Sequence, residues 1–179
     1  GVRIGYDKAR AKDFQHWFTQ VQLAPRQSPH VLESFMDFAR RLGVEDDRLE
    51  WQLPVPPQAY EEARRISAEK PYLVINPCSN PRLRNFRNWS AEGYASVIEH
   101  AWVQHGLVSV LTGGGSAGEK AMGARIETLC QPESVINGIG ATSLKGLLAL
   151  IEGARAAIAP DTGPAHMANA LGTPTLGLY

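Results

Sequence analysis

The sequence has little of what marks several large protein classes. It contains only two cysteines, Cys78 and Cys130, which are too few for a disulfide framework and indicate free thiols in a reducing compartment. Its 18 basic residues cancel its 18 acidic residues, so composition makes no electrostatic case for a nucleic-acid partner.

Long apolar runs are also missing. Lys145, Glu152 and Arg155 interrupt the most apolar stretches, so the sequence predicts no transmembrane span, and no signal-peptide pattern opens the chain. There is no internal repeat and no low-complexity segment. A cytoplasmic protein fits these absences best, unless a leader precedes the given residues.

The length of 179 residues suits one complete domain plus part of another, and the apolar content of 44% is ordinary for a globular protein. Residues 1–5 begin as a strand without an initiator Met, and Tyr179 ends another strand. We therefore expect a fragment that lacks both termini.

The most informative stretch is 158–179, with the sequence IAPDTGPAHMANALGTPTLGLY. An apolar run at 156–159 predicts a buried strand, and Asp161 or Thr162 can cap the helix that follows. Gly172 suits the end of that helix, and 175–179 predicts the next strand. A helix that begins at the carboxyl end of a parallel strand offers N–H groups to an anion, and phosphate is the expected guest.

The same alternation of strand and helix runs through the preceding residues. We expect strands at 72–76, 107–112 and 135–137, and helices that start after Ser90, after the Gly113–Ser116 turn and after Thr142 or Ser143. Buried strands separated by helices predict an α/β domain with a Rossmann-like, doubly wound parallel sheet over 72–179.

The residues before this sheet divide into two further parts. Residues 1–53 contain a short strand at 2–6, a charge cluster at 7–13 and a predicted helix that ends at Gly43. We expect the apolar stripe of that helix to be core; it consists of Val31, Leu32, Phe35, Phe38, Ala39 and Leu42. Residues 54–71 predict a linker, with a stiff Pro-rich segment followed by a connecting helix that opens at Pro57.

Three polar turns follow predicted strands, at 76–80, 112–116 and 161–163. In a parallel sheet they lie at one edge and can line one crevice. The triple glycine at 113–115 has neither the GxGxxG spacing nor the Walker lysine, so a tight turn and a ligand-binding loop both remain open for it.

Several side chains near these turns suit a phosphate ligand. Asp161 can cap its helix or accept from a sugar hydroxyl, and His166 can reach back to a phosphate or simply be packed or solvated. The arginines of the loop before Trp89 suit forked hydrogen bonds to phosphate; they are Arg82, Arg84 and Arg87. The charge cluster at 7–13 is either a solvated face or a grip on an anionic substrate.

These motifs carry a resemblance. The run 160–166, PDTGPAH, resembles the D-T-G-x-x-H signature of the bacterial ADP-heptose:lipopolysaccharide heptosyltransferases. The runs 76–79 and 87–90 resemble that family's N-x-x-S turn and K-x-W-P motif, with Arg at the Lys and Ser at the Pro. The runs 113–119 and 142–144 are similar to its ribose-side and adenine-side segments. The match is strong over 72–179, weaker over 1–43 and negligible across the linker.

The resemblance implies a GT-B fold, in which two Rossmann-like domains face a cleft. Residues 1–53 would end the N-terminal acceptor-side domain, and 72–179 would form a C-terminally truncated nucleotide-sugar-binding domain. The implied enzyme is a glycosyltransferase that moves a heptose from ADP-heptose to the inner core of lipopolysaccharide, with inversion and with no obligatory metal or further cofactor. The implied partners are the donor and the acceptor, with peripheral inner-membrane contact and no obligate protein partner.

The resemblance also assigns roles. The diphosphate and sugar would be held by Asp161, Thr162, Gly163 and His166. Arg87 would neutralise the leaving ADP, Ser79 would bond a phosphate, Glu119 and the Gly113 loop would meet the ribose, and Thr142 the adenine. Lys12 and Arg10 are candidates for acceptor binding. The family's general base is an Asp early in the N-terminal domain, outside this sequence, so we expect donor binding without transferase activity from this piece alone.

Two other interpretations stay open. The chain is also compatible with another GT-B nucleotide-sugar transferase or an epimerase, which a preference for UDP over ADP would favour. From a different class, it is compatible with a non-catalytic nucleotide-binding or scaffolding module.

Overall fold

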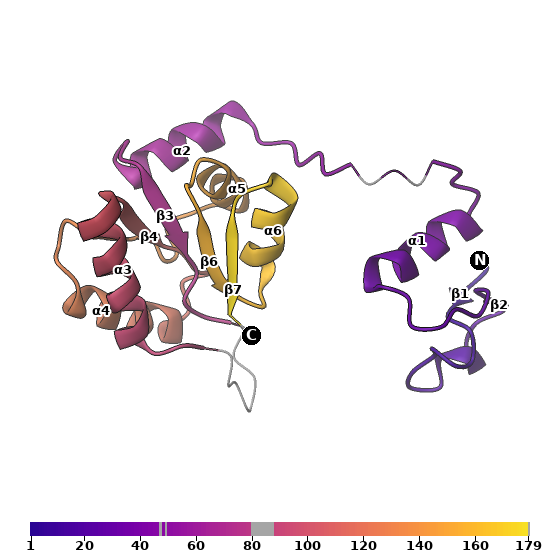
Figure 1. Ribbon diagram of the computed structural model, residues 1–179. Helices are drawn as coiled ribbons and strands as arrows, with labels where there is room; N and C mark the ends of the chain where they lie inside the picture. The colour runs from indigo at the N-terminus through magenta and orange to yellow at the C-terminus, as the bar shows by residue number, and fades with distance from the viewer. Residues whose placement is uncertain (47, 49, 80–87, 179) are drawn as a thin grey trace. The chain divides into compact units, whose positions relative to one another are not determined.

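The computed structural model describes residues 1–46, 48, 50–79 and 88–178. The chain divides into two compact units, Gly1–Glu50 and Trp51–Tyr179. Figure 1 traces both, and each is described by itself. No helix within the described ranges is both long enough and apolar enough to cross a membrane.

The first unit is small. Strand β1 (Ile4–Gly5) pairs in parallel with β2 (Val21–Gln22), and a 3₁₀ helix, η1 (Gln15–Trp17), lies between them in the sequence. Helix α1 (Val31–Arg41) matches the expected helix, but its stripe is core only in part: Leu32, Phe38 and Ala39 are half-buried, whereas the expectation is wrong for Val31, Phe35 and Leu42, which are exposed. Two strands of two residues are too small to cover a helix face.

The second unit contains a sheet of five strands in the order β5-β4-β3-β6-β7. Every neighbouring pair is parallel. The strands are β3 (Tyr72–Ile75), β4 (Val108–Leu111), β5 (Val135–Asn137), β6 (Ala157–Pro160) and β7 (Thr175–Leu178). This sheet confirms the predicted α/β fold class.

Helices cover both faces of the sheet, as the buried strands predict. On one face α3 (Ala91–His105) and α4 (Ala117–Leu129) contribute Tyr94, Ile98 and Ile126 to a core that includes Ile75 and Leu111. On the other face lie α2 (Pro57–Ser67), α5 (Leu144–Glu152) and α6 (Gly163–Leu171). Their core residues are Ala59, Ala63, Ala149, Leu150, Ile151 and Ala168. The sheet is therefore doubly wound.

Helix α2 is part of this second unit. Ala59 and Ala63 are buried in the core that α5 also lines, and Tyr60 bonds Glu152 at the end of α5. The linker predicted over 54–71 thus contains a helix that packs on the sheet domain, because its small alanine face lets α2 approach α5 closely.

Candidate nucleotide-binding site

The carboxyl edge of the sheet has a point where the strand order reverses, between β3 and β6. Ligands of open parallel sheets bind in the crevice beside such a point. Asn76 follows β3 and is only 5% exposed. Its Nδ2 donates to the Cys78 carbonyl at 2.8 Å and to Thr162 Oγ1 at 3.5 Å, which joins the turn after β3 to the turn after β6.

The turn after β6 opens α6. Thr162 holds the N-cap position, but its hydroxyl donates to the Pro160 carbonyl at 3.1 Å, and no side chain among the described residues caps α6 from that position. The other helices that follow strands of this sheet are each capped by a serine: Ser90 for α3, Ser116 for α4 and Ser143 for α5. The positive end of α6 thus has no cap from its N-cap side chain, and a helix start of this kind suits an anion.

Two predicted donor residues lie beside that helix start. Asp161 Oδ1 and His166 Nε2 are 3.6 Å apart, and the His166 side chain is 73% exposed. Gly163 is the first residue of α6. The roles of Asp161, Thr162, Gly163 and His166 toward a ligand stay predictions.

The turn after β4 is built around Glu119. Its carboxylate accepts from the backbone N–H groups of Gly114 at 2.8 Å and Ser116 at 2.9 Å, and from Ser116 Oγ at 2.6 Å. Burial raises the pKa of Glu119, but the hydrogen bonds from Ser116 and Gly114 outweigh it and hold the pKa below its ordinary value. A Cβ on Gly113 would lie 2.9 Å from Glu119 Oε1, so a larger residue there would displace the carboxylate that holds this turn. Glu119 shapes the loop in addition to its predicted ribose contact.

The turns form a continuous rim. Gly140, after β5, donates its N–H to the Gly113 carbonyl at 2.9 Å. The turn after β4 begins at Thr112, whose N–H donates to the Ile75 carbonyl of β3 at 2.8 Å. Burial and the charge of Glu119 raise the pKa of Cys78. Together with the Asn76–Thr162 bond, these contacts confirm that the polar turns share one edge. The prediction from the sequence named neither Gly140 nor Asn76 as a site residue. For Asn76, its position directly after a buried strand was a signal that could have identified it.

Ser79 and Asn88 close the loop that leaves β3. Asn88 Oδ1 accepts from the Ser79 N–H at 2.8 Å and from its hydroxyl at 3.0 Å. Arg87 lies outside the described residues. The ring of Trp89 stands edge-on to Tyr94 at 5.3 Å and leaves no room for a Cβ on Gly93, although Trp89 itself is exposed.

Thr142 lies in the turn after β5, immediately before the cap of α5. The next residue, Ser143, accepts from the Gly146 N–H at 2.9 Å. Glu62, on α2, accepts hydrogen bonds from Ser143. The predicted adenine side is thus held partly by a helix that precedes the sheet.

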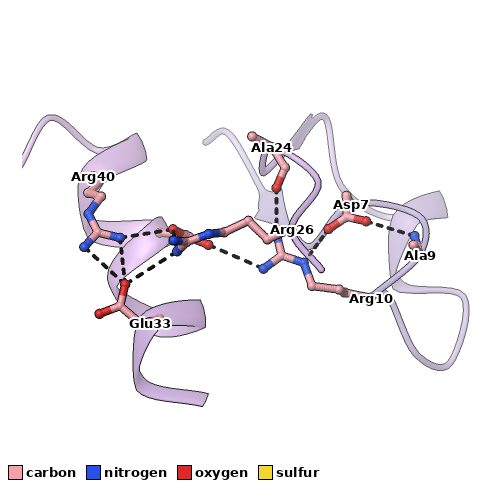
Figure 2. A network of polar contacts seen from close by, with 8 residues as sticks. Asp7, Ala9, Arg10, Ala24, Arg26, Glu33 and Arg40 are labelled. Carbon is pink, nitrogen blue, oxygen red and sulfur yellow. Dashed lines mark hydrogen bonds and ion pairs between the residues drawn. The ribbon is translucent and has the colours of Figure 1, made fainter. Parts of the chain in front are cut away.

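The candidate acceptor residues lie in the first unit. Arg10 donates its Nε to Asp7, its Nη1 to Asp37 at 3.4 Å and its Nη2 to the Ala24 carbonyl at 2.8 Å (Figure 2). The hydrogen bond with Asp7 raises the pKa of Arg10 and lowers that of Asp7. With its side chain 14% exposed, Arg10 ties a loop to α1, whereas Lys12 is exposed. Acceptor binding by either residue stays a prediction.

No three His, Cys, Asp or Glu side chains are grouped as a metal ion would require, within the described part of the chain.

The strand order and the rim of turns define the Rossmann-like class of nucleotide-binding folds. Within that class, the chain belongs to glycosyltransferase family 9, the heptosyltransferases, because the model of that family matches residues 1–179.

Individual relatives agree with this assignment. The chain is 34% identical over 178 residues to the lipopolysaccharide core heptosyltransferase OpsX of Haemophilus influenzae, covering 99% of this chain and 50% of OpsX. Among solved structures, E. coli ADP-heptose lps heptosyltransferase II superposes with a TM-score of 0.76 at 21% identity, over 99% of this chain and 56% of that one. E. coli heptosyltransferase WaaC with ADP superposes with a TM-score of 0.72 at 21% identity, over 99% of this chain and 54% of that one. These likenesses confirm the GT-B type of fold, and the chain spans about half the length of the curated relatives it matches.

Proposed function

We propose that the protein containing this chain transfers a heptose from ADP-heptose to the inner core of lipopolysaccharide with inversion, and that the rim binds the donor's ADP. The family match over the whole chain supports the reaction. The start of α6 carries the assignment of the rim, because its positive end lies at the reversal of the strand order without a side-chain cap from Thr162.

In this proposal the diphosphate and sugar bind at Asp161, Thr162, Gly163 and His166. Arg87 and the α6 N–H groups neutralise the leaving ADP, so no metal is required for that step. Ser79 bonds a phosphate, Glu119 and the Gly113 loop meet the ribose, and Thr142 meets the adenine edge. The proposed general base, an Asp of the N-terminal domain, is not among these 179 residues.

The acceptor sets the proposed location. Lipopolysaccharide core carries a lipid anchor, so we place the reaction in the cytoplasm at the inner face of the membrane, with peripheral contact and no obligate protein partner. Lys12, exposed on the first unit, is the proposed acceptor contact there.

Calorimetric titration tests the donor site. ADP, UDP and GDP are titrated into the wild type and into Asp161→Ala, Arg87→Ala and the control Arg125→Ala, which removes an exposed arginine of α4 paired with Glu92. The proposal expects selective ADP binding that weakens in Arg87→Ala and is unchanged in Arg125→Ala. A preference for UDP would support another nucleotide-sugar enzyme, and no nucleotide binding by the folded protein would overturn the donor site.

Transfer itself needs a separate assay. Heptose incorporation into heptose-free lipopolysaccharide, measured for the complete protein, should persist in excess EDTA. Loss of transfer on chelation, with restoration by a divalent cation, would contradict the metal-free step.

A further inference from the structure

The cap of α5 is incomplete within its own helix. In a capping box, the N-cap serine accepts from the N3 backbone N–H, and an N3 Glu accepts from the N-cap N–H. Ser143 makes the first of these bonds with Gly146. Gly146 holds the N3 position and has no side chain to make the second.

Glu62 of α2 supplies the missing carboxylate. Its Oε1 accepts from the Ser143 N–H at 2.7 Å, and its Oε2 accepts from the Ser143 hydroxyl at 2.8 Å. A Cβ on Gly146 would lie 2.3 Å from the Glu62 carboxyl group, so the carboxylate occupies space that any other residue at position 146 would fill with its side chain. Helix α4 provides the contrast, because there Ser116 and Glu119 form the whole box within one helix.

The two bonds from Glu62 fix both the backbone and the side chain of Ser143. Thr142 precedes Ser143 directly, and Lys145 in the first turn of α5 donates to the Pro54 carbonyl at 2.7 Å, ahead of α2. A turn that is already ordered loses less conformational freedom when a ligand binds to it.

We propose that Glu62 is a positioning residue for the adenine side of the donor site, which it holds through Ser143. The proposal rests on the proposed function, since it takes the base to bind at the turn carrying Thr142. Glu62 makes no contact with the nucleotide in this scheme. It sets the selectivity between nucleotide bases and does not change the affinity for the diphosphate at α6.

The experiment compares Glu62→Ala and Glu62→Gln with two controls. Tyr60→Phe removes the bond between α2 and Glu152 at the opposite end of α5, and Glu61→Ala removes an exposed carboxylate from the same helix. Affinities for ADP, UDP and inorganic pyrophosphate are measured by calorimetry, together with the midpoint of thermal unfolding.

We expect Glu62→Ala to weaken ADP binding roughly fivefold, the order expected for a lost cap, with pyrophosphate affinity unchanged and selectivity over UDP reduced. Glu62→Gln, which keeps one acceptor oxygen, should recover most of the selectivity. Both controls should keep the wild-type ratio of ADP affinity to UDP affinity, even if Tyr60→Phe lowers the midpoint of thermal unfolding.

Two results would overturn the inference while leaving the proposed function standing. One is an unchanged ratio of ADP affinity to UDP affinity in Glu62→Ala. The other is an equal fall of this affinity ratio in Tyr60→Phe, which would mean that Glu62 contributes only to general stability. If the wild type binds no ADP, the proposed function and this inference fail together.

Discussion

Asn76 Nδ2 lies 3.5 Å from Thr162 Oγ1 and joins two turns that are 86 residues apart in the sequence. These turns follow β3 and β6, the strands between which the order of the sheet reverses. The Thr162 hydroxyl serves Asn76 and Pro160, so it does not cap α6. One side-chain contact therefore joins the two turns at the reversal of the strand order, and the start of α6 has no cap from its N-cap side chain.

Asn76→Ala should lower the free energy of unfolding by about 1–3 kcal/mol, because the Cys78 carbonyl loses its donor in a largely buried place. Thr162→Val should cost about 1 kcal/mol, and the double variant should cost less than the sum. Urea unfolding measures all three. Thr128→Val, which removes an exposed hydroxyl of α4, is the control, and strict additivity would mean that the two side chains are not coupled.

Glu119→Gln should destabilise the protein by about 1–2 kcal/mol at pH 7, because the loop amides lose a charged acceptor. The folded pKa of Glu119 lies below the ordinary value of 4.5, so its stabilisation is present above that pH and is lost as the pH falls through the folded pKa. The difference in unfolding free energy between wild type and variant should therefore be largest at pH 7 and narrow as the pH falls below 4.5. A gap that widens in acid would contradict the assignment, and Glu99→Gln on α3 is the control.

Two buried tyrosines should respond oppositely to the loss of a hydroxyl. Tyr72 OH donates to the Leu150 carbonyl at 2.8 Å, whereas Tyr94 OH finds no partner among the described residues. Tyr72→Phe should cost roughly 0.5–1.5 kcal/mol, and Tyr94→Phe should be neutral or stabilising. Thermal unfolding compares them directly. Burial raises the pKa of each phenol to about 12, so neither should ionise at pH 10 in an ultraviolet titration.

Arg10→Ala should loosen the first unit alone. Asp7 is 6% exposed and would keep its charge without the guanidinium that pairs with it. Amide hydrogen exchange at 3–23 should become roughly tenfold faster or more, with 72–178 unchanged because they belong to the other unit. Lys12→Ala is the matched control, since Lys12 is exposed. Equal exchange in both variants would mean that the Arg10 bonds are not structural.

Local chemistry explains which elements were predictable. Ser90 caps its helix as predicted, and Ser143 is the one of the two predicted candidates, Thr142 and Ser143, that caps α5; both were predictable because an N-cap acts on residues only three positions away. The buried strands at 72–75 and 157–160 were equally plain, since short apolar runs between turn residues predict parallel strands. Strand β2 has two residues and no measurable periodicity, so it was missed.

Contacts across the fold explain the rest. Asp161 and Thr162 were equal candidates for the cap of α6; Thr162 takes the N-cap position without a cap bond, and its hydroxyl accepts from Asn76, which lies far away in the sequence. Glu62 and Ser143 are 81 residues apart, and no local pattern pairs them. For the first unit, the stripe on α1 has a helical period but depends on partners beyond two short strands for burial. Arg10 was read as part of a charge cluster, while its bonds to Asp37 and Ala24 come from other segments.

Because α2 packs in the core of the second unit, the sheet domain begins before α2 and not at its first strand. A gene truncated at Pro71 would still encode all five strands, but it would uncover the apolar surface beneath Ala59 and Ala63 and remove the carboxylate that caps α5. Such a product would expose an apolar patch, and we expect it to aggregate. For recombination between family members, the segment that must travel with the sheet therefore begins before its first strand, near Trp51.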